Sequence, residues 1–257
     1  MTSDWDPDRY LRFRAQRRQP YEELVALVEA RPGMHIVDLG CGPGELTVDL
    51  AERLAARSVL GLDVSDAMLA KAKPRSNERV RFEKADIATH PLGEGLDLVF
   101  SNAALHWLPD HASLFARLHA ALGPAGQLAV QMPANFGQAT HTTASELAGE
   151  EPYATALEGR RAGAAVDEPE AYATLLHDLG FTRQIVRQVV YVHELPGPEA
   201  VIEWVKGSML RWYAKQLGPE LYARFADAYE QRLLARLPGR RPFPFTYRRI
   251  LLWGALD

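Results

Sequence analysis

Cysteine is almost absent from this chain of 257 residues, in which Cys41 is the one thiol. A single cysteine excludes an intramolecular disulfide and is typical of a reducing compartment, so we expect a cytoplasmic protein. The sequence has no run of about 18 apolar residues, and we therefore expect neither a membrane-spanning helix nor a membrane partner. Residues 1–6 are acidic and aromatic and lack the apolar core of a secretion signal.

Lysine is also scarce, at 5 of the 29 basic residues, and the net charge is −4. A negative chain has no general attraction for nucleic acid, so we expect no nucleic-acid partner. The remaining basic residues are arginines, which bind carboxylates through two parallel hydrogen bonds in a way that lysine cannot reproduce. Internal repeats are absent, and the histidine and cysteine spacing does not match a metal site, so no metal is expected.

Three of the 19 glycines, by contrast, lie close together in the sequence. A short strand-like run at 35–37 leads into Gly40, Gly42 and Gly44, and a helical pattern follows at 46–54. Glycine permits positive φ and lets a ligand lie against the main chain, while the free N–H groups of the helix start favour a polar group. Asp63 ends the next apolar run, where a ribose-binding carboxylate is expected. The pattern predicts a site for a nucleoside-containing cofactor.

The spacing of the glycines argues against a dinucleotide. The fingerprint G-x-G-x-x-G leaves two residues before its third glycine, whereas one residue separates Gly42 from Gly44 here, and Glu45 follows. A carboxylate would repel a pyrophosphate, and Asp38 faces the same loop. A cationic ligand suits this setting better, and S-adenosylmethionine carries a sulfonium, an ammonium, a ribose and an adenine.

Asp38 and the three glycines resemble motif I of the class I S-adenosylmethionine-dependent methyltransferases. The resemblance implies that Asp86 and the backbone of Ile87 bind the adenine, and that Asn102 lies beside the methionine part. Met68 either packs on the adenine or belongs to the core of its helix. The complete cofactor-binding set that we expect is Asp38, Gly40, Gly42, Gly44, Asp63, Val64, Met68, Asp86, Ile87 and Asn102.

Strand-like and helical patterns alternate along the chain, which favours an α/β fold with a parallel sheet. We expect a Rossmann-like, seven-stranded, mostly parallel sheet with helices on both faces and a helical lid made by insertions. A helical region is expected at 5–30 and a further helix at 171–181. The expected strands are 35–37, 59–62, 79–87, 96–102, 127–132, 184–194 and 250–253.

The expected division of the chain follows from these elements. Residues 1–136 form the N-terminal helix and the cofactor-binding half; 137–170 and 196–240 form the lid, broken at Gly218 and Pro219; and 171–195 and 241–257 complete the core sheet. The lid is rich in aromatic residues and arginine. Trp204 is either lid core or pocket wall, and Arg211 is either on a solvated helix face or part of an anion clamp. Arg248 and Arg249 point to opposite faces of a strand, so one of them faces the pocket.

Nearly the whole chain resembles the trans-aconitate methyltransferase subgroup. The likeness is carried by residues 4–20, the glycine loop, 102–110, 128–133 and several positions from 191 to the last strand. The resemblance implies transfer of a methyl group to one carboxylate of trans-aconitate, a small polycarboxylate. It also implies a set of substrate-binding residues, which are Tyr10, Arg17, Trp107, His193, Trp204, Arg211 and Arg249.

The implied reaction needs no catalytic base, because a carboxylate is already ionised at neutral pH. Positioning and desolvation would then do the work, and no residue is assigned a catalytic role. Three alternatives stay open: another small acid as acceptor, a phenol- or amine-like acceptor for which His106 is the base, and a module that binds S-adenosylmethionine without catalysis. A nicotinamide dehydrogenase is disfavoured by the glycine spacing. The sequence does not indicate an oligomeric state.

Overall fold

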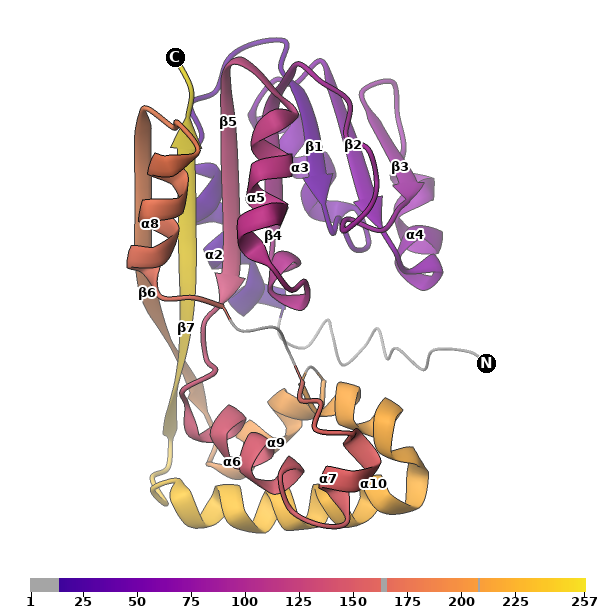
Figure 1. Ribbon diagram of the computed structural model, residues 1–257, viewed down its shortest axis with the longest axis vertical. Coiled ribbons are helices and arrows are strands. Elements are labelled where there is room, and N and C mark those ends of the chain that lie inside the picture. Colours follow the sequence, from indigo (N-terminus) through magenta and orange to yellow (C-terminus); the bar gives the residue numbers. More distant parts are fainter. Residues whose placement is uncertain (1–13, 163–165, 208) are drawn as a thin grey trace.

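A computed structural model describes residues 14–162, 166–207 and 209–257 (Figure 1). In this part of the chain a seven-stranded sheet has the order β3-β2-β1-β4-β5-β7-β6. The pairs from β3 to β5 are parallel, and β7 runs antiparallel to both β5 and β6. The strands are β1 (His35–Leu39), β2 (Ser58–Asp63), β3 (Val80–Lys84), β4 (Leu96–Asn102), β5 (Leu122–Pro133), β6 (Arg183–Leu195) and β7 (Phe243–Ala255). The expected fold class is confirmed.

Helices cover both faces of the sheet. One apolar cluster joins α2 (Arg14–Val25), α3 (Glu45–Arg53) and α4 (Asp66–Ala72) to one face. A second cluster joins α5 (His111–Ala120) and α8 (Pro169–Asp178) to the other face. Neighbouring residues of a central strand divide between the two clusters, because successive side chains point to opposite faces. Two short 3₁₀ helices, η1 (Lys73–Arg75) and η2 (Leu105–Trp107), follow α4 and β4.

The remaining helices form a lid beyond the carboxyl ends of the parallel strands (Figure 1). The lid consists of α6 (Ala139–Ala148), α7 (Tyr153–Leu157), α9 (Glu199–Lys206) and α10 (Met209–Arg236). It has an apolar core of its own, to which the ends of β6 and β7 contribute Leu195, Phe243 and Phe245. The expected break occurs inside α10, where Gly218 is non-helical with φ 71°. Pro219, which follows it, cannot donate a backbone hydrogen bond.

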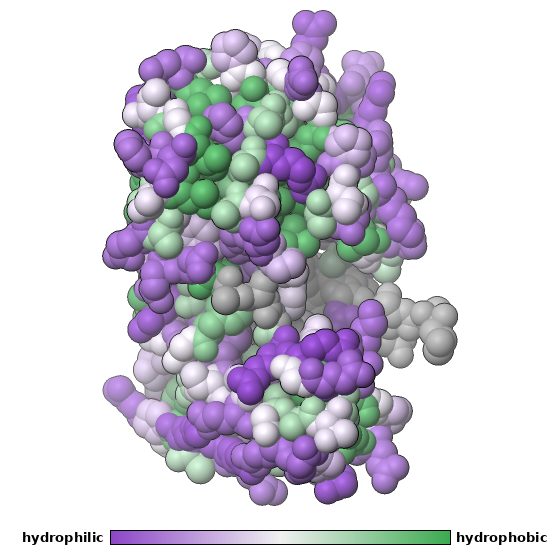
Figure 2. Space-filling model, viewed as in Figure 1, coloured by the Kyte–Doolittle hydropathy of each residue, from purple (hydrophilic) through white to green (hydrophobic). Residues whose placement is uncertain are grey.

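The outer surface of the lid is polar. On the face seen in Figure 2, hydrophilic residues gather along the lid helices, while hydrophobic ones are scattered over the sheet half. Arg232 of α10 forms an ion pair with Glu150, and Arg236 pairs with Glu146 of α6. No helix in the described ranges is both long and apolar enough to cross a lipid bilayer.

Some elements differ in length from the sequence-based expectation. Strand β7 extends over Phe243–Ala255, well beyond the four apolar residues at 250–253. Its first half alternates buried and exposed residues and pairs along its whole length with β6. Long-range pairing therefore decides its extent, since a short apolar run marks only the part buried on both faces. The helical region expected at 5–30 includes α2 at Arg14–Val25, and residues 1–13 lie outside the described residues.

Candidate active site

The glycine loop after β1 combines three left-handed glycines. Gly40, Gly42 and Gly44 have φ of 76°, 57° and 77°. A Cβ added to Gly40 would lie 2.2 Å from the Cβ of Ala104, and one added to Gly44 would lie 2.6 Å from the ring of Phe82. At Gly42 an added Cβ would meet nothing within 4 Å. Gly40 and Gly44 are therefore required for packing, whereas Gly42 borders open space against which a ligand can lie.

Two carboxylates lie at this loop. Asp63 at the end of β2 accepts hydrogen bonds from the backbone N–H of Gly42 (2.9 Å) and Ser65 (2.8 Å), so it fixes the loop against the strand. Asp38 is buried, and Thr47 Oγ1 donates to its Oδ2 at 2.6 Å. Burial raises the pKa of Asp38 to about 7, with a further contribution from the charge of Asp63. Two acidic groups beside an open backbone favour a cationic ligand over a pyrophosphate.

Other predicted cofactor residues lie along the same edge of the sheet. Val64, directly after β2, is 65% exposed. Met68 of α4 is half-buried, and its backbone N–H donates a hydrogen bond to the side chain of Ser65, the N-cap residue of the helix. Asp86, after β3, is exposed and accepts from the N–H of Ala88 (2.9 Å), and the carbonyl of Ile87 accepts from Arg117. All of these residues follow β2 or β3, at the end where ligands bind in open parallel sheets.

A row of polar side chains continues this edge across β4, β5 and β7. Asn102 pairs in register with Gln131, and Pro133 pairs with Arg249, which puts the three polar residues on one face. The guanidinium Nη1 of Arg249 donates to Oε1 of Gln131 at 3.0 Å. Arg249 is 5% exposed, whereas its neighbour Arg248 is exposed on the opposite face. The inward-facing arginine of this pair is thus Arg249.

Aromatic rings surround Arg249 on the lid side. Its guanidinium carbon lies 5.0 Å from the ring centre of Tyr247. The imidazole of His193 stacks on Trp204 at 4.8 Å, with Tyr247 at 5.8 Å from the same indole. Burial, together with the charge of Arg249, lowers the pKa of His193. Trp204 belongs to the lid core and stacks on His193, and its place in the wall of a substrate pocket stays a prediction.

The loop after β4 adds two more rings. His106 is buried in η2, and burial and the nearby Arg249 lower its pKa to about 3. The ring of Trp107 lies 4.6 Å from that of His106 and is 49% exposed. Because His106 is neutral throughout the physiological pH range, it offers a hydrogen-bonding group without charge.

Comparison with known proteins agrees with this geometry. A family model described as a methyltransferase domain matches residues 36–126. A solved S-adenosylmethionine-dependent methyltransferase from Mesorhizobium loti has a similar fold, with a TM-score of 0.52 and 22% identity over 91% of this chain and 96% of its own. Trans-aconitate 2-methyltransferase from Deinococcus radiodurans is 45% identical over 96% of both chains. The protein of the same name from Methylobacterium nodulans is 41% identical over 95% of both.

The chain belongs to the trans-aconitate 2-methyltransferase family. The resemblance inferred from the sequence is confirmed, and so is its class as a methyltransferase. Membership of this family does not itself assign individual side chains, so the binding residues stay predictions. Tyr10 lies outside the described residues, as does the side chain of Arg17, whose backbone is in α2. Arg211 is half-buried on α10, where burial lowers its pKa, and its place in an anion clamp also stays a prediction.

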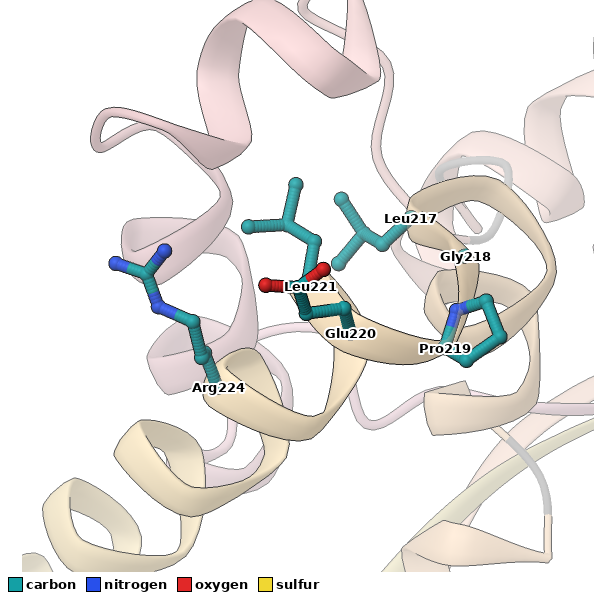
Figure 3. A pocket seen from close by; sticks show the side chains of 6 residues that line it. All are labelled: Leu217, Gly218, Pro219, Glu220, Leu221 and Arg224. Atoms are coloured by element: carbon teal, nitrogen blue, oxygen red, sulfur yellow. The ribbon is translucent and has the colours of Figure 1, made fainter.

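A pocket of about 380 Å³ lies elsewhere, at the break in α10 (Figure 3). Its lining includes Leu217, Glu220, Leu221 and Arg224. All of its lining residues come from α10, and none of them was predicted from the sequence to bind the cofactor or the substrate. The pocket is a consequence of the Gly218 kink and not of the sheet edge where the motifs meet.

Sequence reasoning did not assign Gln131 or Tyr247 to the site. Gln131 is fully buried, and it is the one amide within the apolar stretch 128–132. That isolated polar residue near a strand end was the available signal, because buried polar groups need partners. Tyr247 belongs to the part of the sequence that is rich in aromatic residues and arginine, but its position beside Arg249 depends on the pairing of β7 with β6.

Proposed function

We propose that this protein transfers a methyl group from S-adenosylmethionine to a carboxylate of trans-aconitate, giving a monomethyl ester and S-adenosylhomocysteine. The observation that carries the proposal is the buried guanidinium of Arg249, which lies at the carboxyl edge of the sheet beside Gln131 and the ring of Tyr247. A buried guanidinium beside neutral hydrogen-bonding groups suits an anionic acceptor. The lid helices would cover that acceptor, and the expected location stays the cytoplasm.

The residues at the glycine loop fit S-adenosylmethionine. The open side of Gly42 leaves room against the backbone, and Asp38 and Asp63 provide negative charge beside it. Asn102 Oδ1 is buried and has no hydrogen-bond partner among the described residues, so it can accept from an ammonium group. Val64, Met68, Asp86 and Ile87 would hold the nucleoside. When bound, S-adenosylmethionine supplies an electrophilic methyl group.

The chain's own residues would act by positioning. Arg249, helped by Arg211 and the His193–Trp204 stack, would hold the carboxylates that do not react and leave the reacting one near the cofactor edge. Orientation of this kind can lower a barrier by about 7–11 kcal/mol. A carboxylate needs no base, and His106, with a pKa near 3, is a weak one. The neutral state of His106 thus supports a carboxylate acceptor over a phenol or an amine.

The direct test is a panel of acceptors offered with methyl-labelled S-adenosylmethionine. The panel contains trans-aconitate, other tri- and dicarboxylates, a monocarboxylate, a phenol and an amine. We expect a labelled monomethyl ester, with trans-aconitate giving the highest kcat/KM, and mass analysis of fragments to identify the esterified carboxyl. Labelling of the phenol or amine with none of the acids would overturn the proposal.

Variants separate the two halves of the proposed site. Asp63→Ala should weaken S-adenosylmethionine binding in calorimetry. Arg249→Ala should raise the acceptor KM by an amount worth about 2–5 kcal/mol while the cofactor dissociation constant stays within twofold. Arg248→Ala is the matched control, because that arginine is exposed on the opposite face and should change neither. Equal effects of Arg248→Ala and Arg249→Ala on KM would contradict the acceptor role.

A further inference from the structure

The face of the sheet under α2 changes from apolar to polar toward the carboxyl ends of the parallel strands. Phe100 of β4, Ala129 of β5 and Leu251 of β7 belong to the apolar cluster. Two residues further toward the carboxyl edge on the same face come Asn102, Gln131 and Arg249. Gln131 is the middle residue of this row, between a residue expected to bind the cofactor and one expected to bind the acceptor.

Gln131 uses only half of its amide. The side chain is fully buried, and its Oε1 accepts the hydrogen bond from Arg249 Nη1 at 3.0 Å. Its Nε2 is buried and has no hydrogen-bond partner in the part of the chain that the structure describes. Buried amide donors are nearly always paired, so an unpaired one at a site edge indicates a partner supplied by a ligand.

The same strand provides a comparison. Gln127 lies on the same face of β5, is 1% exposed, and has hydrogen bonds at both its amide oxygen and its amide nitrogen. Its Oε1 accepts from Glu29 N and Trp253 Nε1, and its Nε2 donates to Glu29 O, each at 2.9 Å. A buried glutamine in this strand can thus be fully satisfied by the fold. Of these two buried glutamines, Gln131 is the one whose amide nitrogen has no hydrogen-bond partner among the described residues.

Two neighbours of Gln131 show the same pattern. Asn102 Oδ1 and His106 Nδ1 are also buried without partners among the described residues. Asn102 is the register partner of Gln131, and Ala103 N donates to the Gln131 carbonyl at 2.9 Å, which holds the end of β4 against β5. An amide donor and an amide acceptor therefore stand side by side without bonding to one another. Both groups lie at the carboxyl ends of their strands.

We propose that Gln131 binds the acceptor and positions Arg249: Oε1 fixes the guanidinium, and Nε2 donates to a carboxylate oxygen of the acceptor. This inference rests on the proposed function and adds a residue to it. A neutral donor holds an anion more weakly than a cation does, so it can orient the reacting carboxylate without suppressing its reactivity. Glutamate at this position would place a carboxylate against the acceptor.

The test compares Gln131→Met with Gln127→Met, two nearly isosteric losses of a buried amide from one strand. For Gln131→Met we expect an acceptor KM roughly 10- to 100-fold higher, from loss of a hydrogen bond to a charged group. The dissociation constant of S-adenosylhomocysteine should stay within twofold, and the melting temperature without ligands should fall less than in Gln127→Met, because Gln131 loses one hydrogen bond within the fold and Gln127 loses three. Gln127→Met should lower the melting temperature by several degrees and leave KM unchanged. Gln131→Asn, which keeps an amide that is one methylene shorter, should also raise KM and serves if the methionine variant does not fold.

The outcomes separate this inference from the function on which it rests. Binding of trans-aconitate to the S-adenosylhomocysteine complex is measured by calorimetry beside turnover. If the unaltered protein binds and methylates the acid while Gln131→Met and Gln131→Asn do so with unchanged KM, the inference alone is wrong. A cofactor affinity that falls as much as the acceptor affinity also overturns it. If the unaltered protein neither binds nor methylates any polycarboxylate, both proposals fall together.

Discussion

At the scale of single residues, the candidate site is built from groups whose ordinary charge is changed by burial. Burial lowers the pKa of His106 to about 3, and burial with the nearby charge of Arg249 lowers the pKa of His193. Burial raises the pKa of the Asp38 carboxyl to about 7. A sequence pattern identifies which residues can titrate, but the direction of each shift depends on the dielectric and charges that packing creates around them.

His106 gives a prediction about the absence of general base catalysis. Glutamine at this position keeps a neutral hydrogen-bonding group, so His106→Gln should change kcat by less than about tenfold, whereas loss of a true base typically costs about 10²–10⁴-fold. Because the folded imidazole stays neutral well above pH 3, kcat should show no histidine titration between about pH 6 and 8. A 100-fold loss together with a vanished basic limb in the pH profile would restore the alternative of a protonated acceptor.

Asp38 gives a prediction about proton release. Its pKa near 7 leaves the carboxyl partly protonated at neutral pH, and a bound cation favours the ionised form. Binding of S-adenosylmethionine should therefore release a fraction of a proton at pH 7, and affinity should rise from about pH 5 to pH 8. The stability of the ligand-free protein changes with pH in the opposite direction to the cofactor affinity. The raised pKa of Asp38 stabilises the fold fully below pH 3.8, and this stabilisation is lost as the pH rises through about 7.

Calorimetry in buffers of different ionisation enthalpy measures this proton directly. Asp38→Asn cannot ionise and should bind without releasing it. Equal proton release in the variant and in the unaltered protein would mean that another group titrates on binding.

At the scale of elements, the glycine loop and the long β6–β7 pair differ in how far the sequence predicts them. The loop is local: three glycines with positive φ sit where a strand turns into a helix, and their spacing is visible in the sequence. The first half of β7 depends on a long-range contact, because its pairing partner β6 is distant in the chain. The family resemblance implies His193 as a binding residue, but its proximity to Tyr247 depends on the pairing of β6 with β7.

The loop gives a prediction in which two glycines behave differently. Gly40→Ala should reduce the free energy of unfolding by about 2–5 kcal/mol, because the left-handed backbone and a 2.2 Å approach to Ala104 both oppose a Cβ. Gly42→Ala should cost only about 1–2 kcal/mol from its φ, yet it should weaken cofactor binding more, since its Cβ would project into open space. Urea unfolding and calorimetry with S-adenosylhomocysteine measure the two quantities. The reverse ranking of cofactor affinities would contradict the view that the ligand lies against Gly42.

At the scale of the whole molecule, the sheet and the lid have separate apolar cores. Two clusters fill the faces of the sheet, and a third, around Tyr153, Tyr213 and Phe225, fills the lid. The end of the β6–β7 pair that is nearest the lid contributes side chains to the lid core. His193 and Arg249 belong to the same two strands. The position of the proposed acceptor-binding residues therefore depends on the packing of both the sheet and the lid. The position of the glycine loop depends on the sheet alone.

Truncation of the lid core tests this division. Phe225 is fully buried and stacks on Tyr213 at 4.6 Å, so Phe225→Ala should destabilise the lid by about 3–5 kcal/mol. The affinity for S-adenosylmethionine should stay within twofold, while the acceptor KM rises. Hydrogen exchange should accelerate in peptides from α6, α7, α9 and α10 and not in those from β1, β2 and β4. Uniform acceleration would show that sheet and lid unfold as one unit.

The sequence by itself determined the order of strands and helices, the glycine loop with Asp38 and Asp63, the break at Gly218 and the family, because each depends on residue types at short, fixed spacing. Only the tertiary structure decided that Gln131 meets Arg249, 118 residues away, and that Arg249 rather than Arg248 faces inward. Those contacts follow from the order β5-β7-β6 and its register, which the packing of the whole chain sets. Tertiary packing likewise made the site histidines neutral, since desolvation depends on everything around a side chain and not on its neighbours in sequence.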